Sequence, residues 1–189
     1  MLISKFDNTN IEKHISDYEA KYIFSFPAQY KEFLLKYNGG DTPDTKFKIG
    51  RVSSNLKGLY GLGSAGKLLN YAIFNDMDRI KDFLEDEMLP IGSNAFGDYI
   101  TIGVGQGNGG KVFFLYHDRA KKYIELTEDF KTFVSKCKSE EIGNVMTIDE
   151  RKALLIENCR GDKISQEKID AWQAEIDKYT NIHQEELSL

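Results

Sequence analysis

Two glycine-rich segments have the spacing of loops that hold phosphate groups. The first, Gly61–Leu68, reads Gly-Leu-Gly-Ser-Ala-Gly-Lys-Leu and places a lysine directly after a glycine. A nucleotide-binding loop of this kind needs Ser or Thr after the lysine to hold Mg²⁺, and Leu68 has no hydroxyl group. No long amphipathic helix clearly begins at Lys67, so phosphates would lack a helix N-terminus. We interpret this segment as a flexible glycine loop.

The second segment, Gly105–Gly110, contains the GxGxxG spacing of dinucleotide-binding folds. Those folds continue into a helix, whereas residues 111–118 are rich in β-branched and aromatic side chains. Residues 98–104 have the same character, and the Asn108-Gly109 pair between the two runs tolerates positive φ angles. The pattern therefore predicts a β-hairpin with a glycine loop at its tip.

Histidines and cysteines give little support to catalysis. His14, His117 and His183 do not have the spacing of a metal site, and Cys137 falls on the apolar face of a predicted helix. The sequence also lacks a nucleophile elbow. We therefore expect no catalytic residue, no metal ligand and no cofactor. A hydrolase that uses His117 and Asp118 is a third functional hypothesis, beside two hypotheses in which the protein only binds a partner protein.

Carboxylates crowd one predicted helix and its C-terminal end. Glycosidase chemistry needs two carboxylates across a cleft, which a crowded helix face does not provide. The cluster is either a solvated helix face or a docking surface for a basic partner. Acidic residues after the Asn-Gly-Gly stop and polar residues of the glycine loop could extend that surface. The candidate contacts are Asp41, Asp44, Asp76, Asp78, Asp82, Glu85, Asp86, Glu87, Gln106 and Asn108.

Composition limits the classes of protein that need to be considered. The 189 residues include 25 Lys and Arg against 30 Asp and Glu, a net charge of −5. An acidic chain lacks the basic surface on which direct nucleic-acid binding depends. No apolar run approaches the ~20 residues that span a bilayer, and the N-terminus lacks a signal-peptide core. Two cysteines form no disulfide framework. We expect a soluble, cytoplasmic protein.

The most sharply bounded element is a helix over residues 27–37. Proline is accepted at a helix start, because the first turn does not need its missing N–H group. Tyr30, Phe33, Leu34 and Tyr37 then follow the i, i+3, i+4, i+7 spacing of one buried face. The Asn-Gly pair after Tyr37 supplies a left-handed stop. The pattern predicts a helix that packs on a core.

Other elements follow from similar patterns. We expect helices over 11–21, 76–88 and 130–137, with Thr127 as the cap of the last, and a strand near 123–126. Residues 41–75 indicate strands and loops. Beyond about residue 145, Thr147 and Glu150 form a capping box, and Ser165 can cap a second helix. The sequence predicts a helical hairpin over 147–180, followed by a frayed tail.

Two ordered motifs resemble the SUKH superfamily, which includes bacterial immunity proteins related to a yeast cell-wall-assembly regulator. FPAQYKEFLLKYNGG (26–40) is similar to its LPxxYxxFLxxxNGG opening, with Phe26 in place of the usual Leu. LPIGSNAFGDYITIGVGQGNGGKVFFLYHD (89–118) resembles its second signature, and Phe130–Val134 its closing helix. The matching positions that we interpret as fold determinants are Pro27, Tyr30, Phe33, Leu34, Asn38, Gly39, Gly40, Gly97 and Asp98.

The resemblance implies a fold and a function. The fold is a single α+β domain over 1–145, with a mixed, mainly antiparallel sheet packed by helices, and 146–189 is a helical extension outside the usual core. The function is immunity, by non-covalent occlusion of a cognate toxin domain, often a nuclease or deaminase. The alternative from a different class is a regulatory scaffold that binds a signalling or cell-wall-synthesis protein. The family has no common catalytic residue to transfer.

Overall fold

The computed structural model describes residues 1–63, 77–120, 122–143, 145–180 and 182–189, without the side chains of 77, 78 and 178. The chain divides into two compact units. Unit 1 comprises Met1–Glu140 and Gln184–Leu189, and unit 2 comprises Glu141–His183. Most of the phosphate-loop-like segment Gly61–Leu68 and the candidate contact Asp76 lie outside the described residues.

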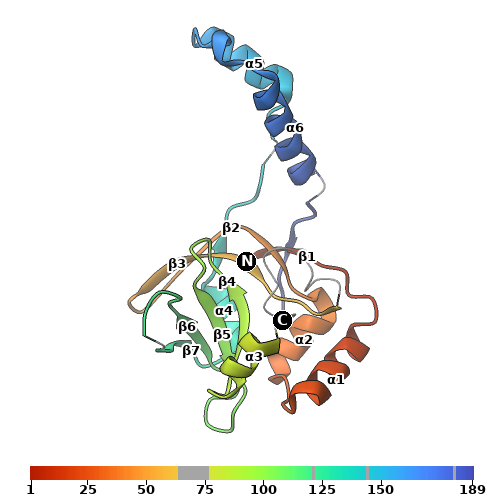
Figure 1. Cartoon of the computed structure of the whole chain (residues 1–189), viewed down its shortest axis with the longest axis vertical. Coiled ribbons are helices and arrows are strands. Elements are labelled where there is room, and N and C mark those ends of the chain that lie inside the picture. The colour runs from red at the N-terminus through yellow and green to blue at the C-terminus, as the bar shows by residue number, and fades with distance from the viewer. Residues whose placement is uncertain (64–76, 121, 144, 181) are drawn as a thin grey trace. The chain divides into compact units, whose positions relative to one another are not determined.

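Unit 1 is built on a curled antiparallel sheet, drawn in Figure 1. The strands are β1 (Leu2–Lys5), β2 (Gly40–Ile49), β3 (Val52–Leu59), β4 (Met88–Ser93), β5 (Tyr99–Gly103), β6 (Val112–Leu115), β7 (Ile124–Thr127), β8 (Lys138–Ser139) and β9 (Glu185–Glu186). Their order is β7-β6-β5-β4-β3-β2-β1-β9, and β8 pairs with β2. The predicted α+β class, with a mainly antiparallel sheet, is confirmed.

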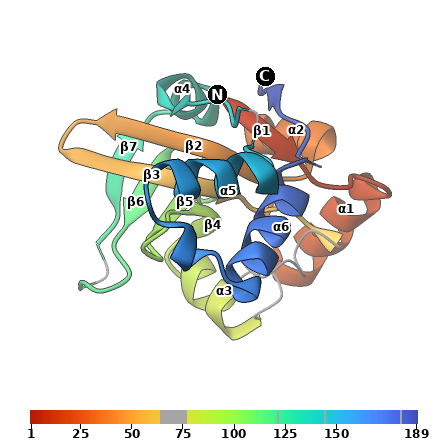
Figure 2. The same cartoon turned by 90° about the horizontal axis from the view of Figure 1, so that it is seen from above.

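Helices cover the sheet on both faces (Figure 2). On one face lie α2 (Ala28–Tyr37) and α4 (Phe130–Lys136), and α1 (Ile11–Tyr22) contacts α2. The ring centroid of Phe130 is 5.2 Å from that of Tyr30. On the other face lies α3 (Met77–Leu84), whose Phe83 ring is 5.4 Å from that of Tyr99. Two layers of helices therefore protect one sheet.

Helix α2 follows its predicted pattern. Its apolar face is fully enclosed: Tyr30, Phe33, Leu34 and Tyr37 are at most 1 % exposed. Asn38 ends the helix with a φ of 51°, and its side-chain Nδ2 donates to the carbonyl oxygen of Leu62 at 3.1 Å. A side chain on Gly39 would approach the backbone of Leu59–Gly61 to 2.7 Å. The chain must therefore turn here on a residue without a Cβ.

The helix predicted over 76–88 is shorter than expected. Helix α3 ends at Leu84, and Glu87 adopts a φ of 56°. Met88 already belongs to β4, where it pairs with Gly103 of β5. The amphipathic pattern continued past the helix because both a helix face and a buried strand need apolar residues. Strand pairing, a long-range contact, decided the boundary.

The predicted cap of α4 was also wrong. Thr127 is the last residue of β7 and is buried. Asp129 caps the helix instead, and its Oδ1 accepts a hydrogen bond from the backbone N–H of Thr132 at 2.7 Å. Cys137 lies at the C-terminal end of this helix, where burial raises the pKa of its thiol to about 12. A thiol with that pKa stays protonated near neutral pH and is a poor nucleophile.

Unit 2 contains α5 (Ile148–Glu157), the 3₁₀ turn η3 (Gly161–Lys163) and α6 (Gln166–Thr180). The capping box of Thr147 and Glu150 is present, and Ser165 Oγ accepts from the backbone N–H of Lys168 at 3.3 Å. Arg151 of α5 forms an ion pair with Glu175 of α6 at 2.8 Å. The predicted helical hairpin is therefore present.

The predicted fraying of the C-terminal tail was wrong for residues 184–189. Strand β9 pairs with β1, and Leu187 is 5 % exposed. The backbone N–H of Leu187 donates to the carbonyl oxygen of Met1 at 2.8 Å. The first and last residues of the chain therefore lie together in unit 1, as Figures 1 and 2 show. No helix in the described part of the chain has the length and apolarity to cross a membrane.

Candidate binding site

The glycine loop, residues 104–111 between β5 and β6, is held by its own hydrogen bonds. The side chain of Asn108 points back into the loop, and its Oδ1 accepts from the backbone N–H of Gly105 at 2.8 Å. Gly110 N donates to the carbonyl oxygen of Gly103 at 2.9 Å. Gln106 and Gly107 are exposed at the tip. Of the two predicted contacts here, Gln106 faces solvent, whereas Asn108 fixes the loop.

The loop is also fastened to the acidic turn, Glu85–Glu87, which follows α3. Asn108 Nδ2 donates to the carbonyl oxygen of Glu87 at 3.1 Å, and Val104 N donates to the same oxygen at 2.9 Å. These bonds explain why Glu87 takes a left-handed conformation, in which its carbonyl oxygen reaches both donors. The structure thus brings five of the ten predicted contacts together: Glu85, Asp86, Glu87, Gln106 and Asn108.

The acidic turn is tied to the residue before β7 as well. The hydroxyl group of Tyr123 donates to Asp86 Oδ2 at 2.8 Å. Burial raises the pKa of Tyr123 strongly, and the Asp86 carboxylate raises it further. Lys111 of the loop forms ion pairs with Glu125 at 3.2 Å and Glu128 at 3.4 Å, and both carboxylates raise its pKa. One ammonium group therefore serves two carboxylates, and a net negative charge is left.

The remaining predicted contacts are placed elsewhere. Asp82 is exposed on α3, and the side chain of Asp78 lies outside the described residues. Asp41 and Asp44 are on β2, which β3 and β4 separate from β5. Asp44 pairs with Lys46 at 3.0 Å. The predicted surface is therefore two surfaces, because β2 and the glycine loop belong to different parts of the sheet.

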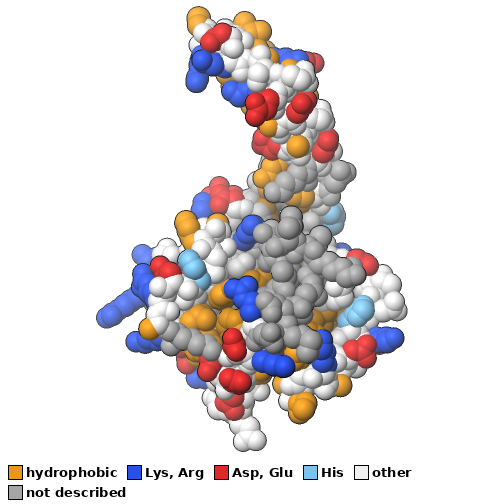
Figure 3. Space-filling view, in the orientation of Figure 1, with side chains coloured by type: hydrophobic (Ala, Val, Ile, Leu, Met, Phe, Trp, Pro, Cys, Tyr) orange, Lys and Arg blue, Asp and Glu red, His pale blue; other side chains and the backbone are white. Residues whose placement is uncertain are grey.

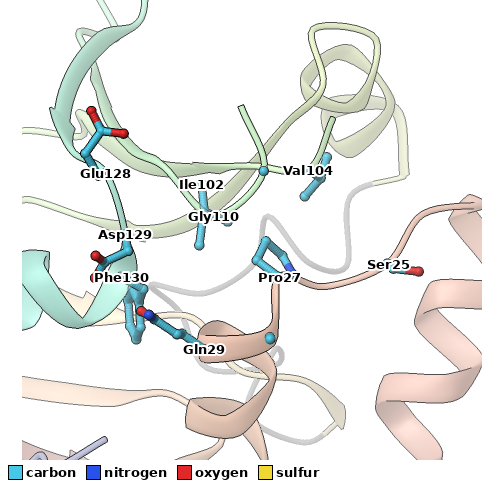
Figure 4. Close-up of a pocket in the computed structure, with 11 residues that line it drawn as sticks. Ser25, Pro27, Gln29, Ile102, Val104, Gly110, Glu128, Asp129 and Phe130 are labelled. Atoms are coloured by element: carbon cyan, nitrogen blue, oxygen red, sulfur yellow. The ribbon is translucent and has the colours of Figure 1, made fainter. Parts of the chain in front are cut away.

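A hollow of about 300 Å³ adjoins the glycine loop (Figure 4). Its floor is apolar, with Ile102 and Phe130 fully buried. Figure 4 shows Ser25 on one side and Glu128 with Asp129 on the other. A Cβ on Gly110 would lie 3.9 Å from that of Pro27. The full lining is Ser25, Pro27, Ala28, Gln29, Ile102, Val104, Gly109, Gly110, Glu128, Asp129 and Phe130.

The lining suits a side chain with an apolar stem and a donor or cationic head. Two of the eleven lining residues carry carboxylates, and none is Lys, Arg or His. Asp129 is engaged as the cap of α4, whereas the Glu128 side chain is 75 % exposed and can turn toward a ligand. Sequence reasoning missed this hollow, because it joins the starts of two helices to a loop far along the chain.

A second cluster gathers at the far end of β5. Asp98 is 7 % exposed, and its Oδ1 lies 2.9 Å from His117 Nδ1 and accepts from the His117 backbone N–H. Burial raises the pKa of Asp98, but hydrogen bonds from His117 and Asn94 outweigh this effect and leave that pKa below its usual value. Gly97 has a φ of 91° in the same turn. This arrangement fastens the end of β6 to the β4–β5 turn.

Asp118 is the third member of this cluster, and His117 and Asp118 are the two residues of the hydrolase hypothesis. One ligand atom from each of Asp98, His117 and Asp118 lies within 4.8 Å of the others, a grouping that could hold a metal ion. His117 and Asp118 are exposed, and Asp98 already bonds to His117 and Asn94.

Together these features define an α+β domain whose loops offer a fixed, acidic surface beside an apolar hollow. The profile of the SMI1/KNR4 family (SUKH-1) matches residues 11–136, so the chain belongs to this family. The match ends with α4, and β8, unit 2 and β9 lie beyond it.

The chain is similar to a SPbeta prophage-derived uncharacterized protein, YokK, of Bacillus subtilis (strain 168). The two sequences are 24 % identical over 160 residues, which are 73 % of this chain and 80 % of YokK.

Proposed function

We propose that the protein is an immunity protein that binds and occludes a cognate toxin domain in the bacterial cell that produces it. The observation that carries this proposal is membership of the SUKH-1 family, whose match covers the α1-to-α4 part of unit 1. Proteins of this superfamily typically act by binding a toxin. The partner is a toxin domain with nuclease or deaminase activity, and the site of action is the cytoplasm.

The surface that supports binding combines the glycine loop, the acidic turn and the hollow. A backbone that is already ordered loses little conformational freedom when a partner docks. The side chain of Asn108 gives this order, because it accepts a hydrogen bond from Gly105 N and donates one to the carbonyl oxygen of Glu87. An apolar hollow next to such a loop can receive one anchoring side chain of the partner. We place the toxin contact here.

Charge gives this surface a preferred partner. Toxins that act on nucleic acid need a basic active-site surface, because their substrate carries phosphates. Glu85 and Glu87 are exposed on the acidic turn, and Glu128 is exposed at the hollow. Complementary charge speeds encounter and disfavours wrong partners. The proposed mechanism is coverage of that basic surface, and it requires no bond chemistry, metal or cofactor.

Co-expression tests the proposal directly. The toxin domain encoded beside this gene is expressed alone and together with the full chain, and growth is measured. Rescue of growth, with one-to-one inhibition of the purified toxin domain, is the expected result. Absence of both would contradict immunity and favour the regulatory-scaffold alternative. A His117→Ala variant that rescues as well as the parent would count against the hydrolase alternative.

A further inference from the structure

A row of cations lies on the solvent face of β2, β3 and β8. Lys46 and Lys48 are exposed on either side of the buried Phe47. Because Lys46 pairs with Asn55 and Lys48 with Ser53, the outward residues of β3 face the same way, and Lys57 is among them. We name this surface the basic strip, defined as Lys46 and Lys48 of β2, Lys57 of β3, Lys138 of β8 and the exposed Arg51 of the β2–β3 turn.

The fold keeps two lysines directly opposite each other in the basic strip. Lys138 of β8 is the register partner of Lys46 on β2, and both are exposed. Like charges in this position destabilise a strand pair. Asp44 at 3.0 Å and Glu140 at 3.9 Å offset the charge of Lys46, and the hydrogen bond to Asp44 raises its pKa. Because this pair does not stabilise the sheet, we look for its role in the binding of a partner.

The local charge is opposite to that of the whole chain. Five cations of the basic strip lie with two carboxylates, Asp44 and Glu140, which both pair with Lys46, whereas the chain as a whole carries −5. Figure 3 shows Lys and Arg side chains at the left edge of the body, where Figure 1 draws the tip of the β2–β3 hairpin. A partner for this surface must therefore be acidic.

The strip fits an extended protein segment better than a nucleic acid. Alternate residues of a strand are about 7 Å apart, which is also the spacing of alternate side chains in an extended acidic peptide. None of the described outward-facing residues of β2, β3 and β8 is aromatic, so unpaired bases have no stacking platform.

We propose that the basic strip is a docking surface for an extended acidic segment of a partner protein, with carboxylates on alternate residues. It lies apart from the toxin contact, since β4 stands between β3, the nearest strand of the strip, and β5, which leads into the glycine loop. The strip therefore adds a second interaction of opposite charge to the proposed immunity function, and it does not depend on that function.

A peptide-binding experiment with the full chain tests the proposal. The probe is a fluorescein-labelled ten-residue peptide of alternating Glu and Ser, followed by anisotropy at about 150 mM salt. We expect saturable binding that weakens as salt rises. A Lys48→Glu, Lys57→Glu double variant should bind at least about tenfold more weakly. The matched control, Lys13→Glu with Lys122→Glu, changes the net charge by the same amount and should stay within about twofold.

A single substitution separates binding from folding. Lys138→Gln removes the like-charge pair, so it should raise the denaturant midpoint while it weakens peptide binding. If Lys138 has only a structural role, the denaturant midpoint and the affinity for the peptide should change in the same direction. That result would contradict the proposal. No binding by the parent chain, or equal losses in the two double variants, would also overturn it. Tighter, strip-dependent binding of a 20-base-pair DNA duplex would assign the surface to nucleic acid instead.

Discussion

Two surfaces of the molecule carry opposite charge and are built differently. One combines the acidic turn and the glycine loop, and the other is the basic strip. The glycine loop is irregular, and its backbone is fixed by Asn108, which accepts a hydrogen bond from Gly105 N and donates one to the carbonyl oxygen of Glu87. The basic strip lies on regular strands, where backbone pairing alone directs alternate side chains outward. The first surface is therefore a shaped backbone, whereas the second is an array of long, mobile side chains. Such surfaces suit different partners: a folded domain for the first, an extended segment for the second.

The difference also concerns what each surface loses when a partner binds. Lysine side chains lose rotamer freedom on contact, which limits the affinity of an isolated strip. An ordered loop beside an apolar hollow loses less and can bury an anchor. We therefore expect the tighter, more specific contact at the glycine loop.

Charge reversal at the acidic surface should produce the largest effect. A Glu85→Lys, Glu128→Lys double variant would place like charges against a basic toxin domain and raise its dissociation constant about 100-fold. Titration calorimetry with the toxin domain measures this change. The control is Lys48→Glu with Lys57→Glu, which should leave toxin binding within about threefold. A larger loss in the control than in the acidic variant would reverse the assignment of the two surfaces.

Loss of the Asn108 side chain should loosen the glycine loop. Asn108→Ala leaves the Gly105 N–H and the Glu87 carbonyl oxygen without this partner, so unfolding should become easier by about 1–2 kcal/mol. Hydrogen exchange of the Gly105 amide should speed up as well. Gln106→Ala is the matched control, since that side chain is exposed at the tip. Unchanged exchange in Asn108→Ala would show that the loop is ordered without these bonds.

Substitution at Asp98 should alter stability in a pH-dependent way, at a distance from both surfaces. Its pKa in the folded chain lies below the usual value of an aspartate. The charged form therefore stabilises the fold at neutral pH, and this contribution disappears as the pH falls through the folded pKa. Asp98→Asn should cost about 1 kcal/mol at pH 7, and the difference from the parent should shrink toward pH 3. Denaturant unfolding at both pH values measures it, and an equal difference at each would contradict this account.

The smallest effect is expected at Asp44. Its ion pair with Lys46 is exposed, and such pairs contribute little to stability. Asp44→Asn should leave the denaturant midpoint unchanged within error. It removes a carboxylate from the basic strip, so binding of the Glu-Ser peptide should tighten about twofold. Weaker peptide binding in this variant would mean that Asp44 orients Lys46 for the partner.

Local rules predicted the fold where neighbours in sequence also decide the structure. Helix α2, the capping box of Thr147 and Glu150, and the β5–β6 hairpin depend on residues a few positions apart. The predictions that failed concern element ends. Met88 is drawn into β4 by pairing with Gly103, and Glu185–Glu186 pairs with β1 from the other end of the sequence. Periodicity contains no information about such long-range pairings.

The same distinction applies to the candidate sites. The sequence predicted a surface from carboxylates and polar loop residues, but it joined Asp41 and Asp44 to the acidic turn, although β2 lies elsewhere in the sheet. It assigned Asn108 to a partner, whereas its amide group bonds within the protein. The alternation of Lys46 and Lys48 around Phe47 was a readable signal for the basic strip, because strand geometry converts a period of two into one face.

The sequence alone determined the class of fold, the helix–stop motif at Asn38–Gly40 and the resemblance to the SUKH superfamily, because these reside in short-range patterns. Tertiary structure alone decided which surfaces exist. It formed the hollow that the starts of α2 and α4 and the glycine loop line together. It also placed the carbonyl oxygen of Glu87 within hydrogen-bond distance of that loop. It also set Lys138 opposite Lys46. Each of these contacts joins residues far apart along the chain, and such contacts form only when the whole sheet assembles.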